Sequence, residues 1–66
     1  MHERLKQIRI ERGLRLKDVA EHLEVTVRSI SRYENGSREP SIEVIVKFCK
    51  LYDVSADYLL GLTDNY

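Results

Sequence analysis

The residues with the clearest chemistry lie between positions 26 and 38. Four side chains share the polar side of a helix expected over residues 27–35: Val27, Arg28, Ser31 and Arg32. An arginine can bind the O6 and N7 acceptors of guanine, a serine can bond to any base, and a valine can pack against the methyl group of thymine. The pattern predicts contacts with the bases of duplex nucleic acid, and an ordinary solvated helix face explains the same residues equally well.

Groups suited to phosphates flank this helix. Thr26 offers a hydroxyl before it, and the segment NGSREP after it offers amide and hydroxyl groups together with the guanidinium of Arg38. Such groups position a protein on the nucleic-acid backbone without reading its sequence. We therefore expect backbone contacts on both sides of the helix.

No other cluster of residues predicts chemistry. Neither His2 nor His22 is followed three or four residues later by a second ligand, so we expect no metal site. The chain has no glycine-rich phosphate loop and no recognisable arrangement of nucleophile, base and orienting carboxylate. We therefore expect no enzyme, no cofactor and no site for a small-molecule effector. The only cysteine, Cys49, is expected to be a small buried hydrophobic residue.

Length and charge limit the possibilities further. The 66 residues form one domain with one small core, which is too little for a deep catalytic cleft. No apolar run approaches the roughly 18 residues that a membrane span requires, and the charged start lacks a signal-peptide core, so we expect a cytoplasmic protein with no membrane partner. The formal net charge of zero is an objection to nucleic-acid binding.

The neutral total conceals an uneven distribution. Residues 1–40 contain nine basic and seven acidic side chains, a surplus of two, whereas residues 41–66 contain two basic and four acidic ones, a deficit of two. Neutrality therefore does not exclude DNA. It predicts weak non-specific binding and a larger dependence on base contacts.

Five short helices must position these side chains. Apolar residues recur at helical spacing and none alternate as in a strand, which predicts an all-α fold. We expect helices near residues 2–12 and 16–23, one capped by Thr26 that ends at Asn35-Gly36, one capped by Ser41, and a short one from Ser55 to Gly61. The fourth has an apolar stripe that should face the core: Ile42, Ile45, Phe48, Cys49 and Tyr52. Tyr33 and Tyr52 should pack in the core with their hydroxyl groups in water.

The second and third helices are joined by only Glu24, Val25 and Thr26. Helices with so short a connection cross steeply, and Ala20, Val25 and Ile30 recur at a spacing that lets them meet inside the corner. This is the geometry of a helix-turn-helix over residues 16–35, whose second helix can enter a major groove.

A family resemblance is carried by the run VTVRSISRYENGSREPS, which has RLKQIRIERGL and DVAEHL before it and SIEVIVKFCKLYDVSADYLLGLTD after it. In one continuous register, this sequence resembles the Cro/CI-type helix-turn-helix proteins, also called the xenobiotic-response-element family. The resemblance covers nearly the whole chain. It implies a single compact, five-helix, lambda-repressor-like domain over residues 1–66 that binds double-stranded DNA as a transcriptional regulator, namely a dimeric repressor of a near-palindromic operator.

The resemblance also assigns roles to residues. It implies base contacts from Val27, Arg28, Ser31 and Arg32. It implies a structural ion pair between Arg9 and Glu34. With charge and capping taken into account, the expected backbone contacts are Arg15, Lys17, Thr26, Ser29, Asn35, Ser37 and Arg38.

The sequence departs from the family pattern at informative places. Leu16 stands where the family usually has a glutamine that contacts DNA, and it cannot bond to a phosphate, so charge from Arg15 and Lys17 is expected to replace that contact. Glu24 stands where glycine is usual, which costs roughly 1 kcal/mol if the residue is left-handed. Ile10 and Leu51 fall where the family often has small or polar residues. They are either scattered surface residues or an extension of a self-association surface.

The C-terminal region predicts a homodimer. Four apolar residues near the end of the chain form the expected interface: Tyr58, Leu59, Leu60 and Leu62. A rival interpretation is a protein-interaction module, such as an antitoxin or an antirepressor partner, that retains the fold without binding DNA. Leu16 and the neutral charge motivate this rival.

Overall fold

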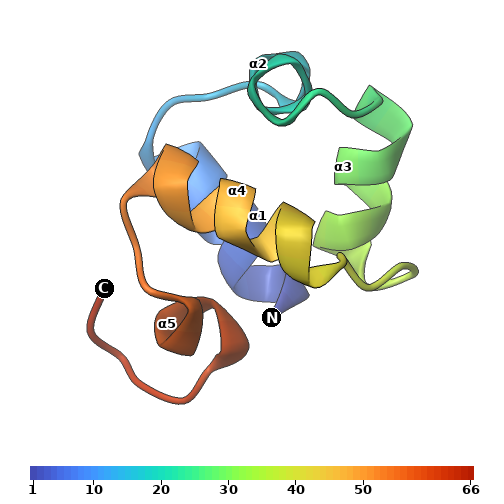
Figure 1. The fold of residues 1–66 in the computed structure, drawn as a ribbon. Helices are drawn as coiled ribbons and strands as arrows, with labels where there is room; N and C mark the ends of the chain where they lie inside the picture. Colours follow the sequence, from blue (N-terminus) through green and yellow to red (C-terminus); the bar gives the residue numbers. More distant parts are fainter.

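A computed structural model describes all residues from 1 to 66 and contains five helices. They are α1 (His2–Glu11), α2 (Leu16–Leu23), α3 (Val27–Asn35), α4 (Ile42–Tyr52) and α5 (Ala56–Leu60). Figure 1 shows α4 in front of α1, with α2 above them, α3 to one side and α5 below, on the side away from α2. The five-helix, all-α prediction is confirmed. None of the helices is both long and apolar enough to cross a membrane.

Local capping signals determine where the helices begin. The hydroxyl oxygens of Thr26, Ser41 and Ser55 accept hydrogen bonds from the backbone N–H groups three residues later, at 3.0, 3.3 and 3.1 Å. Each bond satisfies an N–H group that has no partner within its own helix. All three predicted N-caps are therefore confirmed.

Left-handed residues end most of the helices. Gly36 after α3 and Gly61 after α5 have φ angles of 80° and 83°. Glu24, which stands where the family usually has glycine, ends α2 in the left-handed conformation, with φ 58° and ψ 41°. The turn of the helix-turn-helix is therefore built at a conformational cost of roughly 1 kcal/mol relative to glycine.

The core draws on all five helices and on the residue Val54 between α4 and α5. Its twelve buried members are Leu5, Ile8, Val19, Ala20, Leu23, Ile30, Tyr33, Phe48, Tyr52, Val54, Tyr58 and Leu59. Within it, the ring of Phe48 lies edge-to-face with that of Tyr33 and is stacked on that of Tyr52, with ring centroids 6.1 and 5.9 Å apart.

Three core predictions need correction. Ile42 is 81% exposed, because helical spacing gives the angle of a side chain about its helix but does not ensure that a neighbour covers that turn. Tyr52 is completely buried and its hydroxyl forms no hydrogen bond, so this hydroxyl is not in water. Cys49 is only partly buried, although desolvation raises the pKa of its thiol.

The predicted dimer interface is also wrong in part. Tyr58 and Leu59 are buried in the core of the domain itself, because α5 packs against α4. Only Leu60 and Leu62, at 48% and 74% exposed, remain on the surface.

The segment after α5 folds back onto the start of the chain. The guanidinium of Arg4 donates hydrogen bonds to the carbonyl oxygens of Tyr58 and Thr63, at 2.7 and 2.6 Å. The hydroxyl of Tyr66 donates to Glu11 at 2.9 Å, and its ring lies edge-to-face with Tyr58. Local sequence patterns do not predict these contacts, because they join positions more than 50 residues apart.

Candidate nucleic-acid interface

The corner between α2 and α3 holds α3 with one face in the core. The backbone N–H of Val25 donates to the carbonyl of Ala20 at 3.1 Å, which closes the turn after α2. Ala20 and Ile30 are buried on either side of Val25, which is half-buried. Because the inner face of α3 is fixed in this way, its outer face is presented on a rigid support.

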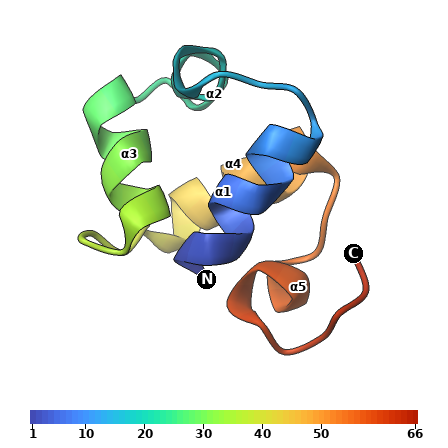
Figure 2. The ribbon, with the colours of Figure 1, turned by 180° about the vertical axis from the view of Figure 1, so that it is seen from behind.

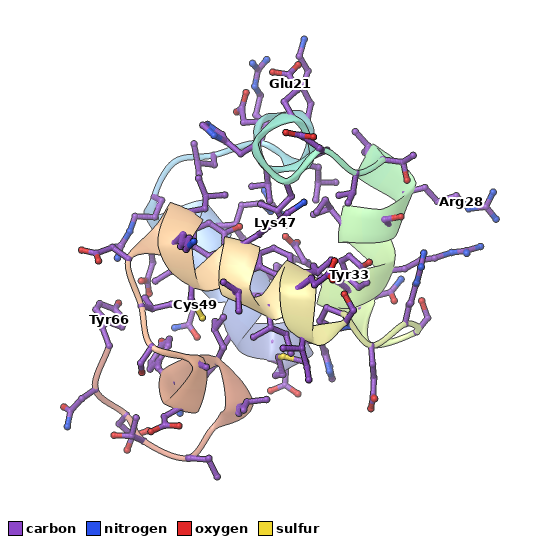
Figure 3. The ribbon with its side chains drawn as sticks, in the orientation of Figure 1. Glu21, Arg28, Tyr33, Lys47, Cys49 and Tyr66 are labelled. Carbon is purple, nitrogen blue, oxygen red and sulfur yellow. The ribbon has the colours of Figure 1, made fainter.

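The outer face of α3 carries the four residues predicted to contact bases. Val27, Arg28, Ser31 and Arg32 are all exposed. Figure 3 shows Arg28 extending from α3 away from the rest of the domain. The guanidinium groups of Arg28 and Arg32 form no hydrogen bond or ion pair within the protein, so their donors are available to an external acceptor.

Most of the predicted backbone contacts surround this face. The hydroxyl of Thr26 donates to the hydroxyl of Ser29 at 3.0 Å, so both oxygens are engaged in the first turn of α3. Arg38 lies across the same helix, with its guanidinium 3.4 Å from the Ser29 oxygen and 5.6 Å from the Tyr33 ring centroid. The loop is thereby held against α3.

The turn after α3 is ordered by its own side chains. The side-chain oxygen of Asn35 accepts a hydrogen bond from the backbone N–H of Ser37 at 2.9 Å. This Asx-type turn leaves the amide NH₂ of Asn35 and the hydroxyl of Ser37 exposed. Both groups are suited to a phosphate oxygen.

The start of α2 differs from the loop after α3, because its arginine already has a partner. The guanidinium of Arg15 donates to the Asp18 carboxylate at 3.1 and 3.2 Å, and the Arg15 backbone N–H adds a third bond at 2.8 Å. These bonds hold the pKa of Asp18 below its usual value. Lys17 is exposed and Leu16 is half-buried. Of the predicted contacts at this end of α2, only Lys17 has an unpaired charge.

Arg9 and Glu34 lie together beneath the interface. The Nε and Nη2 atoms of Arg9 donate to the two carboxylate oxygens of Glu34 at 2.7 and 3.1 Å, and Nη1 donates to the Leu14 carbonyl at 3.0 Å. The two side chains are only 13% and 5% exposed. The hydrogen bond to Glu34 raises the pKa of Arg9. The pair joins α1 to α3 and neutralises the one carboxylate buried under the recognition surface.

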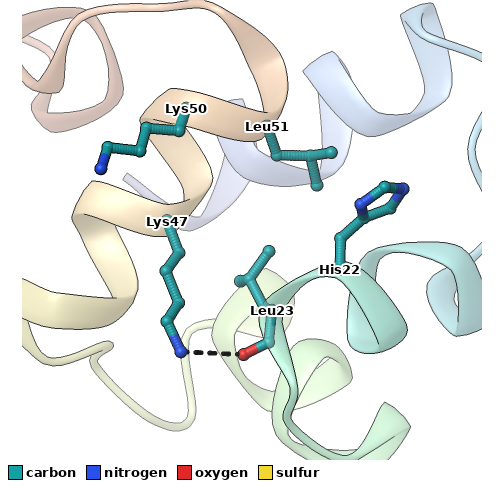
Figure 4. A pocket seen from close by; sticks show the side chains of 5 residues that line it. All are labelled: His22, Leu23, Lys47, Lys50 and Leu51. Carbon is teal, nitrogen blue, oxygen red and sulfur yellow. Dashed lines mark hydrogen bonds between the residues drawn. The ribbon is translucent and has the colours of Figure 1, made fainter.

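Two of the hollows that border the helix-turn-helix join α2 to other helices. One is lined by residues of α1, α2 and α3: Lys6, Arg9, Leu16, Ser31, Glu34 and Asn35. The other lies between α2 and α4, where Lys47 donates to the Leu23 carbonyl at 3.2 Å and Lys50, Leu51 and His22 complete the lining (Figure 4). The predicted contact residues do not include Lys6, although its position one helical turn before Arg9 places it on the α3 side of α1. No group of three or more potential metal ligands occurs in the structure.

Comparison with known proteins agrees with this architecture. A helix-turn-helix family model matches residues 5–59 of the chain. The chain belongs to the Cro/CI-type helix-turn-helix family. The resemblance carried by the run around α3 is thereby confirmed.

Two curated relatives are regulators from Bacillus subtilis. The chain is 40% identical to the uncharacterized HTH-type transcriptional regulator YobD over 63 residues, which are 96% of the chain and 56% of YobD. It is 41% identical to the HTH-type transcriptional regulator ImmR over 59 residues, which are 89% of the chain and 46% of ImmR. The chain thus spans about half the length of these relatives. Their names describe transcriptional regulators.

Solved structures confirm the lambda-repressor-like fold. The P22 c2 repressor, solved in complex with a synthetic operator, superposes with a TM-score of 0.84 at 28% identity, over 88% of both chains. The N-terminal DNA-binding domain of SinR from Bacillus subtilis superposes with a TM-score of 0.81 at 35% identity, over 89% of this chain and 87% of that one.

Proposed function

We propose that this helix-turn-helix domain binds duplex DNA in a sequence-specific manner and acts in the cytoplasm as a transcriptional regulator, as a dimeric repressor. One observation carries the proposal. The outer face of α3 presents two arginines without internal partners, while the opposite face of the same helix is fixed in the core. The similarity to a repressor solved in complex with a synthetic operator supports the same conclusion.

In the proposed complex, α3 enters the major groove of one half-site. Arg28 and Arg32 would each donate two hydrogen bonds to a guanine, and Val27 would pack against a thymine methyl group. Ser31 would bond to a base edge without strong discrimination. Recognition would therefore depend on guanines at two positions, since only arginine supplies a geometry specific to one base.

Groups on either side of α3 would hold the phosphates. Lys17, Asn35, Ser37 and Arg38 have exposed donors that are free or partly free. Thr26 and Ser29 would contribute through the first turn of α3, which their hydroxyl groups already stabilise. Arg15 would contribute only if it exchanges Asp18 for a phosphate.

A dimer would place two α3 helices in successive major grooves, roughly 34 Å apart, over a near-palindrome. Leu60 and Leu62 are the surface residues from the predicted interface that remain available for a two-fold contact. Repression would follow from occupation of promoter DNA.

Selection from randomised duplex DNA tests the proposal. The purified domain is incubated with the pool, and the retained duplexes are amplified and sequenced. Enrichment of inverted repeats with guanines in each half is the expected result. Enrichment of single half-sites would contradict the dimer alone. No enrichment, together with recovery of a protein partner, would overturn DNA binding in favour of the interaction-module alternative.

A further inference from the structure

The hollow between α1, α2 and α3 opens on the same side of the domain as the proposed DNA-binding face. Ser31 and Asn35, which contribute to that face, form part of its lining. Figure 2 shows how the helices around it are arranged, with α1 in front of α4, α2 above and α3 beside it. A DNA strand that flanks α3 would therefore pass over the mouth of this hollow.

Only one charge in the hollow is free. Arg9 and Glu34 neutralise each other, and the remaining guanidinium nitrogen of Arg9 is bonded to the Leu14 carbonyl. Lys6 is exposed on α1 and forms no ion pair, while its neighbour Glu3 lies 3.5 Å from His2 instead. The ammonium group of Lys6 thus gives the hollow a net positive charge.

Leu16, at the start of α2, lines the same hollow and supplies no polar group. A leucine can cover the stem of a neighbouring lysine, but it cannot bond to a phosphate oxygen. A lysine is well suited to that task from a neighbouring helix, because its point charge sits on a long, flexible stem and can approach a phosphate from many directions.

We propose that Lys6 binds a backbone phosphate over this hollow and so supplies, from α1, the contact that Leu16 does not make from α2. The inference rests on the proposed DNA binding and adds a residue outside the helix-turn-helix to it. A phosphate contact carries no sequence information, so Lys6 would add the same increment of affinity to every duplex.

The test compares Lys6→Gln with the wild-type domain on a selected duplex and on an unrelated one, across a series of salt concentrations. The slope of log K against log salt is negative, and loss of one phosphate contact should make it shallower by about 0.9. From 50 to 200 mM salt, the ratio of wild-type to variant affinity should then fall by about 3.5-fold, equally on both duplexes.

Lys50→Gln is the matched control. It removes the same charge from an exposed residue that lines the other hollow, on α4 (Figure 4). We expect an unchanged slope for this variant. Equal slopes for Lys6→Gln and the wild type, or equal changes in the two lysine variants, would overturn the proposal. Absence of binding by the wild-type domain would instead overturn the proposed function itself.

A second variant tests the link to Leu16. Adding Leu16→Gln to Lys6→Gln should recover part of the lost affinity, because an amide at position 16 can bond to the same phosphate, and the slope should stay low because no charge is restored. Failure to recover any affinity would show that Lys6 does not substitute for a contact at position 16.

Discussion

Arginines in two parts of the molecule have opposite environments. In and directly after α1, Arg4, Arg9 and Arg12 all donate hydrogen bonds to the protein itself. In α3, Arg28 and Arg32 donate to nothing within the domain. The same side chain, with its five donors, joins segments of the fold in the first region and is left free for an external acceptor in the second.

This difference explains how a chain with zero net charge can present a basic surface. Two of the arginines near α1 are paired with acids, Arg9 with the buried Glu34 and Arg4 with the exposed Asp64. The free arginines of α3 have no acid opposite them. Net charge counts both kinds alike, whereas the field that a phosphate meets depends on the unpaired ones.

The largest effect should come from breaking the buried pair. Arg9→Ala removes both donors to a carboxylate that is only 5% exposed and leaves that charge without a partner. The free energy of unfolding should fall by about 3–5 kcal/mol. Urea unfolding followed by circular dichroism measures this loss.

A double variant is the control for this prediction. Arg9→Leu combined with Glu34→Leu removes both charges and should lose less stability than Arg9→Ala, since no uncompensated charge remains. If Arg9→Ala unfolds at the same urea concentration as the wild type, then Arg9 does not act as a link between α1 and α3.

Replacing the free arginines of α3 should weaken DNA binding without destabilising the fold. Arg28→Ala or Arg32→Ala should weaken binding to the selected operator by about 1–3 kcal/mol and relax discrimination at one base position. Stability should stay within about 0.5 kcal/mol of the wild type, because these are exposed side chains without partners. Titration of fluorescent duplexes measures the affinity. Undiminished operator binding after removal of both arginines would refute the role of α3.

Arg4 belongs to the arginines that bond within the protein, and its replacement should affect stability but not DNA binding. Its guanidinium bonds to the carbonyl oxygens of Tyr58 and Thr63, so Arg4→Ala should lower the free energy of unfolding by about 1–2 kcal/mol and leave DNA affinity unchanged. Asp64→Asn is the control. It removes only the ion pair with an almost fully exposed carboxylate, so stability should hardly change. An equal loss in both variants would show that the ion pair, and not the carbonyl bonds, holds the C-terminal segment.

The difference between these regions also separates what sequence could predict from what it could not. The beginnings of three helices could be predicted from local signals, since Thr26, Ser41 and Ser55 each accept a hydrogen bond from an N–H group only three residues away. The exposed face of α3 followed from helical spacing. The contacts of Arg4 and Tyr66 join residues more than 50 positions apart, and no local pattern encodes them. For the same reason, Leu59 could be recognised as apolar but not assigned to the core rather than to a dimer interface.

Arg15 shares features of both groups of arginines, and the variant that frees its guanidinium should have the smallest effect of those proposed. It is exposed at the start of α2, where a phosphate contact is proposed, yet its guanidinium is bonded to Asp18. Asp18→Asn removes the competing charge while keeping an oxygen that can accept the bond from the Arg15 backbone. DNA affinity should rise slightly on all sequences, and its salt dependence should become steeper, because Arg15 is released toward the phosphates.

The pH dependence of the same variant checks the assignment. The bonds from Arg15 lower the pKa of Asp18 in the folded state, so the aspartate stabilises the fold above its ordinary pKa. This stabilisation is lost as the pH falls through the lowered pKa. Asp18→Asn should therefore unfold with a weaker acid dependence than the wild type, as measured by thermal unfolding in buffers from neutral to strongly acidic pH. An unchanged salt dependence together with an unchanged acid profile would mean that Arg15 is neither held by Asp18 nor released by its loss, and would leave Lys17 as the cation that serves the start of α2.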